Sequence, residues 1–373
     1  MRSGHDGSEG MRKRWAPDGT MRFGLFWPYS RTPIPSEEVA RRNPDVLDID
    51  NHVRLARAAE EAGLDFGLIA DGYAPASEEN SRVGFQDPST NAVLWAPQLF
   101  AATRHLGFVS TMHTAYLHPT LIARLGAHLD FLSGGRWGWN VVNGFREHEA
   151  LLFGLENLDH DGGYDRSEEA TTIIRLLWAG DSIDHTGSHY RVKGRIRRPL
   201  PAETPLLVSA ASSARGRIYA ARHCNYLFAA PNDARTIREL TAELESNAAA
   251  AGREPPRIIM LCDLFIREEP GRAQEEYGAL MESQDAEARK VWAQHLSRIN
   301  PHGARADQIT AFAGTPAEIA EQIVSLHRDS GLTGILFRPI IWQPEEISRL
   351  AGVFGLLEKA GVWAPPAARG HSW

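Results

Sequence analysis

The chain has 373 residues, 43% of them hydrophobic and 23% charged, and its formal net charge at neutral pH is −7. This composition fits a globular protein with a core of its own, and the acidic balance argues against a nucleic-acid-binding surface, which would usually be basic. The sequence contains no run of about 18 apolar residues, so no segment is expected to cross a membrane. The two cysteines, Cys224 and Cys262, match no metal-binding spacing and are expected to be buried thiols in a cytoplasmic protein.

The two ends of the chain differ from the rest. Residues 1–20 are basic and polar, lack the apolar core of a signal peptide, and are predicted to form a flexible tail. One domain is predicted over residues 21–363. The last segment, residues 364–373, has no periodic apolar pattern and is predicted to form a second, loose tail.

Short apolar segments recur through residues 21–363, and most come before a longer segment with helical spacing. The strand candidates are Arg22–Trp27, Phe66–Ala70, Leu106–Thr111, Trp137–Val142, Leu206–Ser209, Tyr226–Ala229, Ile258–Phe265 and Gly334–Arg338. They are nearly continuous apolar runs, as expected for parallel strands covered on both faces. The helix candidates include Asp50–Ala62, Asn91–Thr103, Thr120–Leu132, Glu168–Trp178, Ala234–Ala251, Pro316–Ser330 and Pro344–Lys359. Eight such units predict an α/β fold, a closed (β/α)₈ TIM barrel with loop insertions.

A doubly wound sheet is the competing architecture. It should carry a glycine-rich turn after its first strand, where this chain has the proline-rich segment WPYSRTPIP, and this favours the barrel. In a barrel, that segment would lie at the active-site end, either covering the site or as a simple surface loop. Long connections at Asn143–Ser167, Gly180–Pro205 and Pro270–Gly314 are further candidates for functional loops, and a small hairpin is predicted around Thr186 and Gly187.

Four segments, in this order, carry a family resemblance: LDFGLIADG, LGFVSTMHTAYLHPTLIARLGAHLDFLSGGRWGWNVVNG, HDGGYDRSEEA and SAASSARGRIYAARHCNY. Together they resemble the bacterial luciferase-like flavin-dependent monooxygenases over almost the whole chain. The nearest similarity is to the pyrimidine oxygenase and dimethylsulfone monooxygenase branch, with some similarity to nitrilotriacetate-type monooxygenases. The resemblance implies a luciferase-like barrel that uses FMN.

Thr111 and Asn140 stand at or near the ends of the third and fourth candidate strands, where the catalytic groups of a barrel gather. Taken alone, they could be a packed β-former and a strand cap. The resemblance implies that both lie beside the flavin ring nitrogen and the oxygen site, so they are the predicted catalytic residues and are also predicted to bind the cofactor.

Ser212 and Ser213 begin a predicted helix, where hydroxyl and backbone N–H groups could bind an anion or simply cap the helix. The resemblance implies that they bind the FMN phosphate together with Tyr164. Many family members have an arginine immediately before that tyrosine. This chain has Gly163, which leaves only a backbone N–H for the phosphate.

The resemblance adds three further cofactor positions. Asp71 and Gly72, after the second strand, match positions that lie against the flavin. Glu149, in the loop after the fourth strand, matches another FMN contact, although a solvated loop glutamate is the alternative.

Other candidate residues near the site have ordinary alternatives. His113 and His118 could serve as general bases, but fifteen histidines make a chance location a fair alternative. Aromatic side chains that could line an apolar substrate pocket, or belong to the core, are Trp95, Trp137, Trp139 and Phe145. No metal site is predicted.

The function implied by the resemblance is that of a two-component FMN monooxygenase. A separate NAD(P)H:FMN reductase would supply reduced FMN, O₂ would react with it, and a flavin peroxide would transfer one oxygen atom to a small organic substrate. The matching threonine and asparagine imply a peroxide on the ring nitrogen. A homodimer or homotetramer is expected, with no nucleic-acid or membrane partner. The alternatives are a deazaflavin-dependent oxidoreductase on the same barrel and a non-catalytic flavin-binding protein.

Overall fold

The computed structural model describes residues 19–144, 146–155, 160–299 and 309–373. Most of the predicted N-terminal tail, residues 1–18, lies outside this range. None of the described helices is long and apolar enough to cross a membrane.

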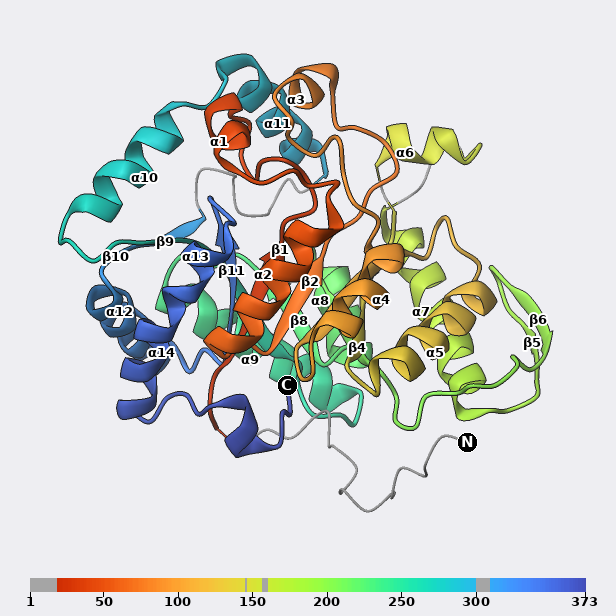
Figure 1. The fold of residues 1–373 in the computed structure, drawn as a ribbon. Coiled ribbons are helices and arrows are strands. Elements are labelled where there is room, and N and C mark those ends of the chain that lie inside the picture. The colour runs from red at the N-terminus through yellow and green to blue at the C-terminus, as the bar shows by residue number, and fades with distance from the viewer. Residues whose placement is uncertain (1–18, 145, 156–159, 300–308) are drawn as a thin grey trace, which may run out of the picture.

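A closed barrel of eight parallel strands forms the centre of the molecule (Figure 1). Around the barrel its strands are β1 (Arg22–Trp27), β2 (Phe66–Ile69), β3 (Gly107–His113), β4 (Trp137–Val142), β7 (Leu206–Ser209), β8 (Tyr226–Ala229), β9 (Arg257–Ile266) and β11 (Gly334–Pro339). The sheet closes because β9 pairs with both β8 and β11, and β11 pairs with β1. The predicted TIM barrel is therefore confirmed.

Helices surround the barrel and alternate with its strands. They are α2 (Ile49–Ala62), α4 (Ala92–Ala102), α5 (Pro119–Ser133), α7 (His160–Ala179), α8 (Ala214–His223), α9 (Ala234–Ala250), α12 (Pro316–Ser330), and the pair α13 (Pro344–Ser348) and α14 (Leu350–Lys359). Local signals set their ends: Asp48 caps α2, which ends at Gly63 with a φ of 98°, and Thr315 and Glu318 form a capping box on α12. The predicted helix Pro344–Lys359 is interrupted at Arg349.

Five further helices gather beyond the carboxyl ends of the strands, in the upper part of Figure 1. They are α1 (Glu37–Arg42), α3 (Glu78–Arg82), α6 (Glu147–Leu152), α10 (Arg272–Glu282) and α11 (Ala286–Ile299). The predicted hairpin is confirmed as β5 (Ile183–Thr186) paired with β6 (Arg191–Gly194).

The structure has a strand on the main sheet that was not predicted, β10 (Thr310–Gly314). It pairs with the last residues of β9, from Cys262 to Ile266, whereas β8 pairs with the first residues of that strand. Because β9 is ten residues long, it extends past the end of β8 and leaves an edge for β10 to occupy.

The predicted loose tail at residues 364–373 is wrong. A short 3₁₀ helix (Pro366–Arg369) leads to Trp373, which is only 2% exposed and closes the amino-terminal end of the barrel. Its ring stacks on Phe66 with centroids 5.4 Å apart, and a Cβ added at Gly107 would lie 2.7 Å from that ring. Arg369 forms a buried ion pair with Asp65 at 2.6 Å. This apolar slot is made by residues distant in sequence, so the tail composition alone does not reveal it.

Candidate active site

The predicted catalytic pair lies side by side at the carboxyl ends of two neighbouring strands. Thr111 on β3 is paired in register with Asn140 on β4, and both side chains are buried. Val109 belongs to the cluster inside the barrel, and Thr111, two residues later, points to the same side. The Asn140 Nδ2 donates to Thr111 Oγ1 at 2.9 Å, and Thr111 Oγ1 donates to the Ile69 carbonyl at 2.8 Å.

Within the described part of the chain, this network leaves an acceptor on each of the two residues without a proton donor. The hydroxyl proton of Thr111 is used by the Ile69 carbonyl, so its oxygen has only a lone pair left to offer. The Asn140 Oδ1 is buried and has no hydrogen-bond partner among the described residues. An unsatisfied buried acceptor is costly, which makes the pair suited to a ligand that brings an N–H group.

Asp71 and Gly72 lie next to this pair, after β2. The Asp71 carboxylate accepts from the backbone N–H groups of Gly72 and Ala92, at 2.9 and 3.0 Å, and from Asn91 Nδ2 at 3.0 Å. It therefore fixes the start of α4. Burial raises the pKa of Asp71 to about 6, against the lowering effect of these hydrogen bonds.

Glu149 is buried, only 1% exposed, which contradicts the alternative of a solvated loop glutamate. Its Oε1 accepts from the Tyr73 backbone N–H at 3.1 Å and lies 3.4 Å from Arg146 Nη1. A Cβ added at Gly72 would come within 2.8 Å of the same oxygen. Because glycine has no side chain, the segment after β2 can approach Glu149 of α6 closely at position 72.

The four predicted phosphate-binding residues gather where α7 meets the start of α8. Ser213 caps α8, with its Oγ accepting from the Gly216 N–H at 3.1 Å. Tyr164 is 8% exposed, and a Cβ added at Gly216 would collide with its hydroxyl, so the phenol lies against the first turn of α8. Gly163 precedes it on α7, and Ser212 precedes the cap.

The cations near this helix start are already paired with carboxylates. Arg215 contacts Asp165 and Glu168, and Arg217 donates to Glu243 Oε1 at 2.8 Å. An anion here would therefore be bound by neutral donors and by the helix N-terminus.

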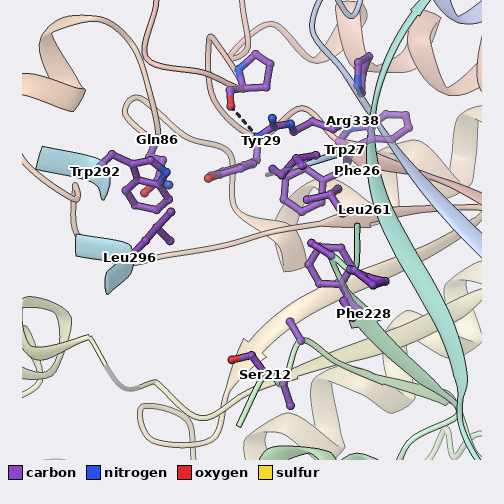
Figure 2. Close-up of a pocket in the computed structure, with 18 of the residues that line it drawn as sticks. Phe26, Trp27, Tyr29, Gln86, Ser212, Phe228, Leu261, Trp292, Leu296 and Arg338 are labelled. Atoms are coloured by element: carbon purple, nitrogen blue, oxygen red, sulfur yellow. Dashed lines mark hydrogen bonds between the residues drawn. The ribbon is translucent and has the colours of Figure 1, made fainter. Parts of the chain in front are cut away.

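A cavity of about 580 Å³ opens on the other half of the barrel mouth. It is bounded by the ends of β1, β8, β9 and β11, by the proline-rich loop after β1, and by α11 (Figure 2). Of the predicted cofactor residues, Ser212 lines it. The proline-rich segment thus covers the site, as its position in the sequence predicts.

The structure decides between pocket wall and core for the aromatic candidates that it describes. Trp137 and Trp139 are fully buried in the core, where both contact the Trp178 ring edge to face, because they point outward from β4 toward the helices. Trp95 packs against His52 with ring centroids 4.7 Å apart, and Phe145 lies outside the described residues. The aromatic walls of the cavity are instead Phe26, Trp27, Tyr29, Phe85, Phe228, Trp292 and Trp342.

The two candidate histidines have different environments. His118 caps α5, its Nδ1 accepting from the Thr120 N–H at 3.2 Å. His113 ends β3, is 4% exposed, and packs against the rings of Tyr73 and Tyr116, with centroid distances of 5.3 and 5.5 Å. Burial, with a smaller contribution from Arg146, lowers the pKa of His113 to about 3, so its ring is neutral near pH 7.

One ion pair at the cavity was not predicted. Arg338 on β11 is in register with Asp263 on β9, and the two form a bidentate pair with distances of 2.6 and 3.0 Å. Tyr277 of α10 donates to the same carboxylate at 2.8 Å. Each residue is isolated in the sequence, and only the strand register brings them together. In the described part of the chain, no group of His, Cys, Asp and Glu residues could hold a metal ion.

Comparison with known proteins adds three findings. Residues 21–333 match the family model described as luciferase-like monooxygenase. The chain is 31% identical over 272 residues to N-acetyl-S-(2-succino)cysteine monooxygenase of Bacillus subtilis (strain 168), covering 65% of this chain and 61% of that protein. It is 27% identical over 299 residues to FMNH₂-dependent dimethylsulfone monooxygenase of Pseudomonas fluorescens (strain Pf0-1), covering 74% of this chain and 79% of that one.

Among solved structures, a riboflavin lyase with modified FMN and riboflavin superposes with a TM-score of 0.85 at 26% identity, covering 93% of each chain. The chain spans only 52–61% of the length of the Bacillus protein and several other curated relatives. Similarity to those proteins is thus similarity to part of each.

Proposed function

The chain belongs to the luciferase-like monooxygenase family, and on this basis we propose that it is an FMN-dependent monooxygenase that oxygenates a small organic substrate. Reduced FMN would come from a separate NAD(P)H:FMN reductase. Bound reduced FMN would supply the two electrons with which one atom of O₂ enters the substrate and the other becomes water.

The observation that carries this proposal is the buried Asn140 Oδ1 without a partner. The ring of reduced FMN carries N–H groups along its edge, and Asn140 Oδ1 and the remaining lone pair of Thr111 Oγ1 are acceptors for such groups. We assign these two residues to hold that edge at the ends of β3 and β4. Thr111 and Asn140 also fix each other's orientation, so the acceptors would be in place before the ligand binds.

The phosphate would lie at the start of α8. Ser212 and Ser213 would provide hydroxyl and backbone donors, and the Tyr164 phenol would donate from the side of α7. Gly163 supplies no charge, so the phosphate would be held by neutral donors. Such a site suits a cofactor that must arrive from a partner enzyme and leave after oxidation.

Asp71, Gly72 and Glu149 would lie against the ring from the side of β2. Asp71 acts through the start of α4, which its carboxylate fixes, and Gly72 allows the close approach of the Glu149 loop. We assign them to shape the ring site; the oxygen chemistry itself is assigned to Thr111 and Asn140.

Anaerobic titration with reduced FMN, and in parallel with the reduced deazaflavin, tests the proposal. We expect a clear preference for reduced FMN. Tyr164→Phe should weaken FMN binding, whereas Tyr190→Phe, whose hydroxyl donates to the Thr114 carbonyl outside this site, should not. Asn140→Leu should weaken binding of the ring, and hence of riboflavin as well, while Tyr164→Phe should spare riboflavin.

Each other outcome has a defined meaning. A preference for the deazaflavin would replace the proposal with hydride transfer on the same barrel. Binding of neither cofactor would support a non-catalytic protein. Oxygen consumption without product from any substrate would contradict the monooxygenase assignment.

A further inference from the structure

The cavity and the proposed ring site occupy opposite halves of one barrel mouth. Thr111 and Asn140 stand on β3 and β4, whereas the cavity is bounded by β8, β9, β11 and β1. Ser212, at the proposed phosphate site, lies at one end of the cavity (Figure 2). A flavin held on the first half would therefore face a second ligand in this cavity, which makes the cavity the substrate site. This step depends on the proposed function.

The walls of the cavity are mostly apolar and aromatic. Phe26 and Phe228 stack at a centroid distance of 6.1 Å, next to Leu261. Figure 2 shows Trp292 and Leu296 of α11 opposite them. Two apolar faces with a gap between them fit a flat, largely apolar molecule, because such a molecule buries both of its faces.

Among the described residues, the charged groups that line the cavity are Arg217, Glu239, Glu243 and Arg338, two of each sign. Arg217 is paired with Glu243 at 2.8 Å, and Glu239 lies 3.9 Å from Arg235 at the exposed rim. Arg338 is paired with Asp263, which is 2% exposed and does not reach water. An anionic ligand would add a negative charge beside these carboxylates, and no cation among the described lining residues is without a carboxylate partner, so it should be rejected.

Arg338 still has donors to offer a neutral ligand. Its Nε and Nη2 donate to Asp263, and Nη1 donates to the Pro33 carbonyl at 3.4 Å. A guanidinium has five N–H groups, so two remain. Its side chain is 14% exposed and lines the cavity, where a carbonyl, sulfonyl or hydroxyl oxygen would accept from it.

We propose that this cavity binds a neutral, flat, largely aromatic substrate whose hydrogen-bond acceptor is held by Arg338. Arg338 is thus a specificity residue, and the Asp263 carboxylate behind it makes the site select against carboxylate-bearing substrates. Tyr277 holds that carboxylate from α10 and so links the pair to the segment that also supplies Trp292.

Equilibrium dialysis with three related probes tests the proposal on the full chain without flavin. The probes are 9-fluorenone, which has one carbonyl acceptor, fluorene, which has none, and 9-fluorenone-2-carboxylate, which adds one negative charge. We expect fluorenone to bind about tenfold more tightly than either of the others, as one hydrogen bond to a charged donor predicts. Equal binding of fluorenone and fluorene would overturn the role of Arg338. Equal or tighter binding of the carboxylate would overturn the selection against charge.

Two variants make the assignment specific. Arg338→Met combined with Asp263→Asn removes the donor together with the charge that it neutralises, and should make fluorenone and fluorene bind equally. Trp292→Ala should weaken both by the same factor, because it removes only wall area. Retained preference for fluorenone in the double variant would refute the assignment, as would the absence of binding by all three probes to the wild type.

The probe result is separate from that for the cofactor. Probe selectivity without reduced FMN binding would refute the proposed function, and with it the role of the cavity as a substrate site, but would leave the cavity as a binding site for neutral, flat ligands. FMN binding without probe selectivity would leave the proposed function and refute the assignment of Arg338.

Discussion

Replacing Trp373 with alanine should strongly destabilise the barrel although the residue lies far from the proposed active site. The indole is 2% exposed, stacks on Phe66, and fills the space above Gly107. Removing a buried aromatic side chain of this size lowers the free energy of unfolding by about 3–5 kcal/mol. Because water can enter the vacated space at this end of the barrel, we expect a loss near 3 kcal/mol. A typical domain has a free energy of unfolding of only about 5–15 kcal/mol, so this is a large fraction.

The assay is urea denaturation followed by circular dichroism, with the slope of the transition checked for constancy between variants. Trp373→Phe should recover most of the loss because a ring can still stack on Phe66. Leu94→Ala, at a side chain that is 74% exposed, is the control and should change little. Affinity for reduced FMN should be the same in all three variants. If Trp373→Ala lowers the free energy of unfolding by less than about 1 kcal/mol, the residue does not seal the barrel and the segment is a tail after all.

Three further predictions concern pH, the phosphate site and assembly. Burial lowers the pKa of His52 from 6.5 to about 4, so between these pH values the unfolded chain binds a proton that the folded chain does not. The free energy of unfolding should therefore fall as pH drops from 6.5 toward 4, by roughly 3 kcal/mol in total. His52→Gln should reduce the slope of the free energy of unfolding against pH by the equivalent of about one proton. Gly216→Ala would place a Cβ against both the Tyr164 hydroxyl and the Ala211 Cβ, and by displacing this part of the phosphate site it should weaken reduced FMN binding roughly tenfold. Gly278→Ala, with open space around it, should not alter the dissociation constant. Phe131 is 66% exposed on α5, and if it helps to form the expected homodimer or homotetramer, Phe131→Lys should lower the mass measured by light scattering; an unchanged mass would exclude this face.

The barrel could be predicted because each of its strands is a short apolar run buried on both faces. Strand β10 was not predicted because TAFAG is short and contains three small residues. It pairs with the part of β9 that extends beyond the end of β8. For Trp137 and Trp139 the sequence left both pocket wall and core open, because it does not show which side of a parallel strand faces inward. The structure settles this: Asn140 points into the barrel, and the tryptophans point to the helices.

The candidate site also has residues that could be predicted from the sequence and residues that could not. Residues that carry the family motifs, such as Thr111, Asn140 and Tyr164, were predicted as site residues by resemblance, and the structure brings them to one end of the barrel; their roles stay predictions. Arg338 and Trp292 could not be identified, because their meaning depends on contacts between distant segments. Arg338 needs the register of β11 with β9, and Trp292 needs the path of α11 back over the barrel mouth.

The dual pairing of β9 bears on how substrate range can change over evolution. The chain leaves the barrel at the end of β9, builds α10 and α11, and returns as β10 on the same strand. Because both ends of this excursion are anchored to one strand, its length and sequence can vary without disturbing the register of the other seven barrel strands. The excursion can therefore be exchanged as a unit, which would give a new wall to the cavity while leaving the Thr111 and Asn140 half of the barrel unchanged.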